Sequence, residues 1–455
     1  MPYRPVEVEF AVECVRYREH SVRVRMHSWR RWEVAYNPCE VLLGRAFALM
    51  TPCAELLRRR PAEVRRAAAA ALGKAGARAV RILRGALRDA APQVREAACE
   101  SLGRIGHPSA ISALARVLKR DSYRDYLGQY ALRVAASKAL AQIGAASLPA
   151  LRDAAATGDL FTRLLALQTA VQLGDAESLE TLVAMLHSGD TPTRLAVCAA
   201  LGRTRYPAAA EPLLQVLQDS SQARLHAEAA QALGRLRARE AVPVLLEALE
   251  DEQAALRAAA CEALGAIGDP AARPALEMRL TDTAPMVRRA ACEALRELRH
   301  PESAHAVMQL LTEDNEWNRQ TACHVLGLLG NRVAAPALIE RLGDASALVR
   351  ATACRALMHL HVTSAVEAIA PLLQDPDGWV RSSACEALAK LGGKTVAEQL
   401  EPLTQDRDKK VRIAAWAALG ELGDPRAQPA LETLMEDDDA DVRRNARWAL
   451  RWMRR

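Results

Sequence analysis

The segment MVRRAACEALREL, residues 286–298, returns 93 positions later as WVRSSACEALAKL, residues 379–391. When the whole chain is aligned on the Arg of the Val-Arg pair, the segment proves to be one copy of an internal repeat, most often 31 residues long. The aligned residues are Arg65, Arg95, Arg133, Arg163, Arg194, His226, Arg257, Arg288, Arg319, Arg350, Arg381, Arg412 and Arg443. A fixed period of about 20 to 50 residues is typical of solenoid proteins, so we predict about thirteen stacked structural units.

The second half of each unit is predicted to be an amphipathic helix. Apolar residues recur at positions −1, +3, +4 and +7 from the aligned residue, as in Val287, Ala291, Cys292 and Leu295, and these positions share one helical face. Seven of the ten cysteines occupy position +4. Because they occur once per unit and do not converge, we interpret them as buried, reduced thiols and not as metal ligands or disulfides.

The first half of each unit is predicted to be a second helix, which several units open with a proline 14 residues before the aligned position. In two units the proline lies ten residues before it, at Pro371 and Pro402, where it should distort the helix. An Asp such as Asp344 often stands six residues before the aligned Arg, in the predicted turn between the helices. There it can cap backbone N–H groups and reach the Arg of an adjacent unit. We therefore expect a ladder of Asp–Arg pairs along the array.

A helix–turn–helix unit with this period and a D-x5-R turn resembles the HEAT repeat, in the subclass of phycobilin-lyase-type (PBS-lyase) HEAT-like repeats. The resemblance covers roughly residues 51–455. It implies an all-α, right-handed α-α superhelix in which stacked units bury one continuous core and the second helices line the concave wall. The family includes scaffolds, lyase subunits and a few enzymes, so the resemblance identifies the fold more closely than the function.

The N-terminal residues 1–38 do not follow the repeat, and we assign residues 39–455 to the array. Two segments, residues 6–15 and 21–27, alternate between apolar and polar residues with period two. This alternation predicts a β-hairpin or small β-rich module that covers the open end of the first unit.

Both ends of the chain are rich in arginine interleaved with aromatic residues. Candidate contacts for an anionic partner are Arg23, Arg25, Arg30, Arg31, Arg447 and Arg451. Basic and aromatic residues together are typical of proteins that hold single-stranded nucleic acid. A solvated hairpin face and a polar cap on the last unit predict the same composition, and we favour that structural interpretation.

The remaining sequence features argue against catalysis. The chain has no phosphate-binding loop, no nucleophile elbow, no C-x2-C pair and none of the His-Glu dipeptides that iron-dependent deoxyhypusine hydroxylases of the HEAT family use. We therefore expect no catalytic residues, no metal site and no cofactor. A lyase- or hydroxylase-like enzyme or enzyme subunit is the least favoured alternative.

Composition and hydropathy point to a soluble protein. The formal net charge is only +6 over 455 residues, and no run of about 18 apolar residues could span a bilayer. The N-terminus also lacks the apolar run of a signal peptide. We expect a cytoplasmic protein.

The concave groove is the surface that we expect to be functional. Positions −2, +1, +5 and +9 of the second helices should point into it, and over three consecutive units they carry Trp317, Gln320, His324, Leu348, Arg355, His359 and Trp379. Exposed Trp and Arg side chains are typical of protein-binding hot spots. We predict a non-catalytic scaffold or adaptor that grips an extended segment or helix of a partner protein. The alternative is nucleic-acid binding through the basic ends, and an insertion at residues 119–131, which contains three tyrosines, is a further candidate surface.

Overall fold

The computed structural model describes residues 57, 61–124, 130–219, 223–437 and 439–453. Over these residues the chain forms 25 α-helices and no β-strand. The chain divides into two compact units, the first ending at Ala209 and the second beginning at Ala210. The all-helical prediction is confirmed for the described residues, whereas the β-hairpin expected in residues 1–38 lies outside them.

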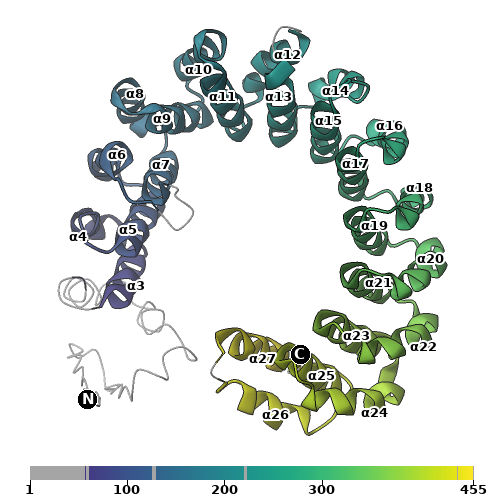
Figure 1. Cartoon of the computed structure of the whole chain (residues 1–455). Coiled ribbons are helices and arrows are strands. Elements are labelled where there is room, and N and C mark those ends of the chain that lie inside the picture. The colour runs from purple at the N-terminus through teal and green to yellow at the C-terminus, as the bar shows by residue number, and fades with distance from the viewer. Residues whose placement is uncertain (1–56, 58–60, 125–129, 220–222, 438, 454–455) are drawn as a thin grey trace, which may run out of the picture. The chain divides into compact units, whose positions relative to one another are not determined.

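The first unit is built from two layers of helices (Figure 1). Helices α3, α5, α7, α9 and α11 pack side by side in sequence order, and α4, α6, α8 and α10 each pack against a helix of that row. Their bounds are α3 Ala62–Leu72, α4 Val80–Ala86, α5 Pro92–Ile105, α6 Ile111–Arg120, α7 Ala131–Ile143, α8 Leu148–Thr157, α9 Leu160–Gln172, α10 Ala176–Ser188 and α11 Thr191–Arg203.

The second unit repeats this arrangement. Figure 1 shows α13, α15, α17, α19, α21, α23 and α25 along the inner side of a curved row, with α14, α16, α18, α20, α22 and α24 on its outer side. The bounds are α12 Ala210–Gln218, α13 Ala223–Leu236, α14 Val242–Ala248, α15 Ala254–Ile267, α16 Arg273–Met278, α17 Pro285–Leu298, α18 Ala304–Met308, α19 Glu316–Leu329, α20 Ala335–Glu340, α21 Ala347–His359, α22 Val366–Ile369, α23 Gly378–Leu391, α24 Ala397–Leu400, α25 Lys409–Glu421, α26 Ala427–Leu434 and α27 Ala440–Met453.

The outer helices of the second unit are short, and from α16 to α24 each continues into a 3-10 segment. Pro371 and Pro402, where the sequence predicts a distortion, both lie in the first turn of a 3-10 segment that follows an α-helix of only four residues. The 3-10 segments do not depend on proline, because those that follow α16, α18 and α20 contain none. The tighter turn leads directly into the Asp-containing loop before each inner helix.

In the first unit, one core cluster of buried apolar side chains runs from α3 to α9. The leucines at position +7, such as Leu326 and Leu357, and the cysteines at position +4 are fully buried. A second contact joins successive inner helices at position +8 of one and position +6 of the next. A Cβ atom added to Gly327 would lie 2.8 Å from Ala356 Cα, and one added to Gly265 would lie 2.7 Å from Ala294 Cα. The absence of a side chain at position +8 therefore allows neighbouring helices to approach closely.

Candidate functional site

From Arg257 to Arg381, the aligned arginines of the second unit form the expected ladder with acidic residues of the following repeat. Arg257, Arg319, Arg350 and Arg381 each donate two hydrogen bonds to one carboxylate, at distances between 2.7 and 2.9 Å. Their acceptors are Asp282, Asp344, Asp375 and Asp406. Each arginine also donates to the backbone carbonyl of the acidic residue in its own turn, as Arg319 does to Glu313 at 2.7 Å. Each arginine thus ties two successive turns together, which is a structural role.

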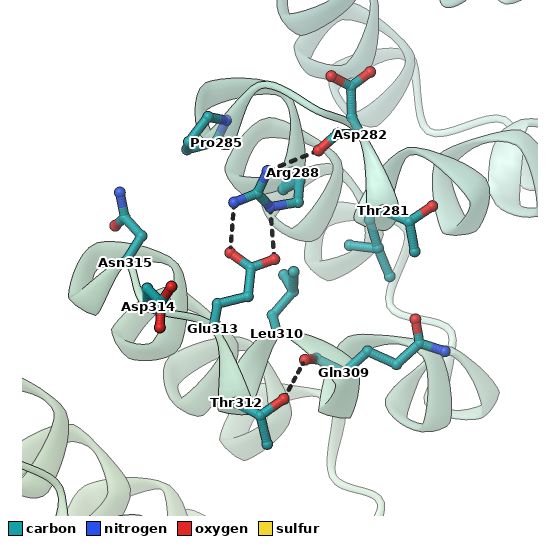
Figure 2. Close-up of a pocket in the computed structure, with 11 residues that line it drawn as sticks. Thr281, Asp282, Pro285, Arg288, Gln309, Leu310, Thr312, Glu313, Asp314 and Asn315 are labelled. Carbon is teal, nitrogen blue, oxygen red and sulfur yellow. Dashed lines mark hydrogen bonds and ion pairs between the residues drawn. The ribbon is translucent and has the colours of Figure 1, made fainter.

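One rung of the ladder uses Glu in place of Asp. Arg288 approaches Glu313 through Nε at 2.6 Å and Nη2 at 2.8 Å, and the Asn318 amide donates to the same carboxylate at 2.8 Å. Figure 2 shows this rung at the edge of an open pocket whose wall also includes Pro285 and Asn315. Because its polar walls are the turn residues that cap and pair these helices, we assign this pocket a structural role.

In the second unit, four successive inner helices carry a large apolar side chain at the same repeat position. Met286 on α17, Trp317 on α19 and Trp379 on α23 are 47%, 56% and 41% exposed, and Leu348 on α21 is half-buried. All four occupy position −2, in the first turn of an inner helix. We call these four residues the apolar row. Exposed aromatic and sulfur-containing side chains aligned in this way are typical of protein-binding surfaces.

Local hydrogen bonds hold the backbone of both tryptophans. The Asn315 side chain accepts hydrogen bonds from the N–H groups of Trp317 at 2.9 Å and Asn318 at 3.2 Å. Asp377 likewise accepts from the N–H of Trp379 at 2.8 Å. These are N-terminal caps of α19 and α23, which satisfy N–H groups that have no partner within the helix. Each indole is therefore displayed on a backbone that is already ordered.

About two helical turns beyond the apolar row, the same face carries a polar row at position +5. Its members in three successive repeats are His324, Arg355 and Glu386, and His359 lies one turn further along α21. Loss of hydration and the charge of Arg355 lower the pKa of His359. Loss of hydration raises the pKa of Glu386, although Arg355 acts in the opposite direction. Arg355 therefore acts electrostatically on His359 of its own helix and on Glu386 of the next inner helix.

Arg355 is half-buried, and within the described residues neither a hydrogen bond nor an ion pair engages its guanidinium. By contrast, Arg296 pairs with Glu293 at 2.7 Å, and Lys390 pairs with Glu421 at 2.9 Å. Gln320, half-buried on α19, completes the predicted set. The structure thus brings the seven predicted groove residues onto three adjacent inner helices, α19, α21 and α23.

The buried cysteines are not positioned for chemistry. Cys99, Cys261, Cys292, Cys323, Cys354 and Cys385 are completely buried and form no disulfide. Burial raises the pKa of Cys323 and Cys385 to about 12, so both thiols stay protonated near neutral pH. Within the described part of the chain, no three His, Cys, Asp or Glu side chains gather as metal ligands would.

The predicted anionic contacts are only partly described. Arg23, Arg25, Arg30 and Arg31 lie outside the described residues. Arg447 and Arg451 lie on α27, where Arg451 is exposed and Arg447 is half-buried. Across the helices that the structure describes, none is both long and apolar enough to cross a bilayer.

Two tyrosines of the insertion pack against other side chains, as expected for a longer loop between helices. Tyr123 packs against the core of the first unit. The guanidinium carbons of Arg124 and Arg133 lie 4.3 and 4.2 Å from the ring centroid of Tyr130, and the ring of Phe161 lies 5.2 Å from it. Tyr130 and Phe161 occupy positions −3 and −2 of successive repeats, so alignment of the repeats does not by itself pair them.

Comparisons with known proteins agree with the helical architecture. A family model described as HEAT repeats matches residues 51–131, 161–229, 210–296, 279–357, 335–408 and 366–451. A comparison with curated proteins finds no match. The solved Kap95:Nup1 complex is similar with 14% identity and a TM-score of 0.52, covering 92% of this chain and 68% of that chain. Human deoxyhypusine hydroxylase in complex with glycerol is 25% identical over 54% of this chain and 96% of that chain, with a TM-score of only 0.26.

Proposed function

This chain belongs to the HEAT-repeat family, and we propose that it is a non-catalytic scaffold or adaptor that binds a partner protein on the inner face of its second unit. The partner contributes an extended segment or a helix. We further propose that the array consists of about thirteen repeats of the phycobilin-lyase type and acts in the cytoplasm. The 31-residue period supports the repeat assignment.

The observation that carries this proposal is the apolar row. A folded chain gains free energy by burying a Trp side chain, so two tryptophans left 56% and 41% exposed at equivalent repeat positions are costly without a partner to cover them. The caps at Asn315 and Asp377 order the backbone before a partner arrives, which reduces the entropy lost on binding. The Kap95:Nup1 complex has a similar fold and, as its name states, contains a bound protein, which is consistent with this use of the fold.

The charges of the inner face favour a protein over a polyanion. Glu262, Glu293, Glu386 and Glu421 lie on this face together with Arg355 and Lys390. A nucleic acid presents regularly spaced negative charges, which the glutamates would repel. A folded or extended protein segment can match alternating charges and also supply apolar side chains for the tryptophans.

An affinity purification from nuclease-treated extract tests the proposal. The full chain is compared with a Trp317→Ala, Arg355→Glu, Trp379→Ala variant, and the retained proteins are identified by mass spectrometry. The matched control is Met278→Ala with Val333→Ala, because these side chains are 60% and 39% exposed and lie outside the inner helices, Met278 in α16 and Val333 in the 3-10 turn Arg332–Ala334.

We expect specific proteins to be retained by the wild type and the control but lost from the triple variant. Retention of the same proteins by all three forms would contradict the proposal. If only nucleic acid is recovered, before nuclease treatment and with a steep dependence on salt, the basic ends of the chain become the functional surface.

A further inference from the structure

We infer that the inner face of the second unit selects an extended peptide with a central acidic residue flanked on both sides, about three residues away, by apolar residues. This inference rests on the proposed function and adds the chemical class of the segment that is bound. It follows from the relative placement of the apolar row and Arg355.

The acidic residue follows from the state of Arg355. Within the described residues no hydrogen bond or ion pair engages its guanidinium, so its donors are available to a partner. A carboxylate of the partner restores two charge-assisted hydrogen bonds in the planar geometry that arginine favours. The other titratable groups around it are His324, His359 and Glu386. Only Glu386 is an acid, and within the described residues no hydrogen bond or ion pair joins it to Arg355.

The spacing along the peptide follows from the packing of the inner helices. Helices α19, α21 and α23 pack side by side, and packed helix axes are roughly 10 Å apart. Trp317 and Trp379 are therefore roughly 20 Å apart, which an extended chain covers in about six residues. Arg355 lies on the middle helix, so its acidic partner falls about three residues from each apolar anchor.

The alternating side-chain directions of an extended peptide match the apolar row on one side and the polar row at position +5 on the other. Position −2 and position +5 are seven residues apart on each helix, which corresponds to roughly 10 Å along the helix axis. A peptide lying between the rows points alternate side chains to opposite sides. The first and seventh residues of the motif face the tryptophans, and the fourth faces Arg355. The motif reads the same in both chain directions, so it does not depend on the polarity of the bound peptide.

Selection of a randomised twelve-residue peptide library on the immobilised full-length protein tests this inference. Enriched peptides are synthesised, labelled with fluorescein and measured by fluorescence anisotropy. We expect enrichment of Asp or Glu with an apolar residue three positions away on each side. Arg355→Gln and the Trp317→Ala, Trp379→Ala variant should each weaken binding at least tenfold, whereas Met278→Ala with Val333→Ala should not weaken it.

Reversing the charge at position 355 provides a second, more specific test. Arg355→Glu should reverse the preference, so that a selected peptide with Lys in place of its central acid binds this variant more tightly than the original peptide does. No enrichment, enrichment without a central acid, or unchanged binding by Arg355→Gln would overturn the inference. Competition by a single-stranded oligonucleotide as strong as that by the unlabelled peptide would also overturn it.

Failure of the inference and failure of the proposed function give different results. If the Trp317→Ala, Trp379→Ala variant no longer captures the partner but Arg355→Gln captures it as the wild type does, the inner face binds proteins without this charge preference. If capture survives the loss of both tryptophans, the proposed function itself is wrong.

Discussion

Arg319 and Asp344 are joined across two successive repeats by a pair of 2.8 Å hydrogen bonds, from Nε to one carboxylate oxygen and from Nη2 to the other. The Asp344 side chain is only 4% exposed and that of Arg319 12%. Removing one member of such a pair leaves the other charge buried without a partner, which costs far more than the intact pair contributes. The ladder therefore makes the interface between repeats sensitive to single substitutions.

We predict that Asp344→Ala lowers the free energy of unfolding by about 3 kcal/mol, because the guanidinium of Arg319 stays desolvated. Urea denaturation followed by circular dichroism measures the loss. Glu401→Ala is the matched control, since Glu401 pairs with Arg426 at 2.7 Å but both side chains are more than half exposed. The control should leave the transition nearly unchanged. Equal losses in the two variants would mean that burial does not determine the strength of the ladder.

The ladder also predicts how stability depends on pH. Hydrogen bonds from Arg257 and Arg381 lower the pKa values of Asp282 and Asp406 in the folded state. Unfolded Asp titrates near pH 3.9, so this stabilisation is present above that value and is lost as the pH falls below it, toward the lower pKa values of the folded state. The urea midpoint should fall over this range. It should fall less steeply in Asp282→Asn, Asp406→Asn, and an unchanged slope would contradict the assignment.

Glycine at position +8 provides a third prediction. Replacing Gly327 by Ala would improve helix propensity by about 1 kcal/mol, but the new Cβ would lie 2.8 Å from Ala356 Cα, and such overpacking costs about 1 to 3 kcal/mol. We expect a net loss of stability because a backbone atom cannot move aside cheaply. Gly85→Ala, in helix α4 with no atom within 4 Å of the new Cβ, should instead be stabilising. A gain at both positions would show that the helices separate easily.

Features that recur in many repeats could be predicted from the sequence, whereas contacts set by the packing of neighbouring repeats could not. The period predicted the helix pairs, the Asp-x5-Arg turn predicted the pairing of Arg319 with Asp344, and the face of each inner helix predicted the exposure of Trp317. These features recur in many repeats, so alignment within one chain reveals them. The contact of Gly327 with Ala356 and the packing of Phe161 against Tyr130 depend on the exact approach of neighbouring repeats. Periodicity does not determine that approach.

Substitutions of Asn315, which caps α19, test whether the ordered backbone of Trp317 contributes to partner binding separately from contact with its ring. Asn315→Ala removes the acceptor for the Trp317 and Asn318 N–H groups and should lower the free energy of unfolding by about 1 kcal/mol. It should also weaken binding of a selected peptide by a few-fold, which is less than Trp317→Ala, because the ring remains but its backbone is no longer held. Asn315→Asp keeps an acceptor and should restore both stability and binding.

Asp408 supplies the control for this prediction because it caps α25 in the same way, accepting from the Lys410 N–H at 2.8 Å, with no tryptophan in the first turn. Asp408→Ala should cost a similar amount of stability and leave peptide binding unchanged. If the two alanine variants weaken binding equally, the cap at Asn315 acts only through the stability of the array. If only Asn315→Ala weakens binding, the ordered backbone of Trp317 is part of the recognition surface.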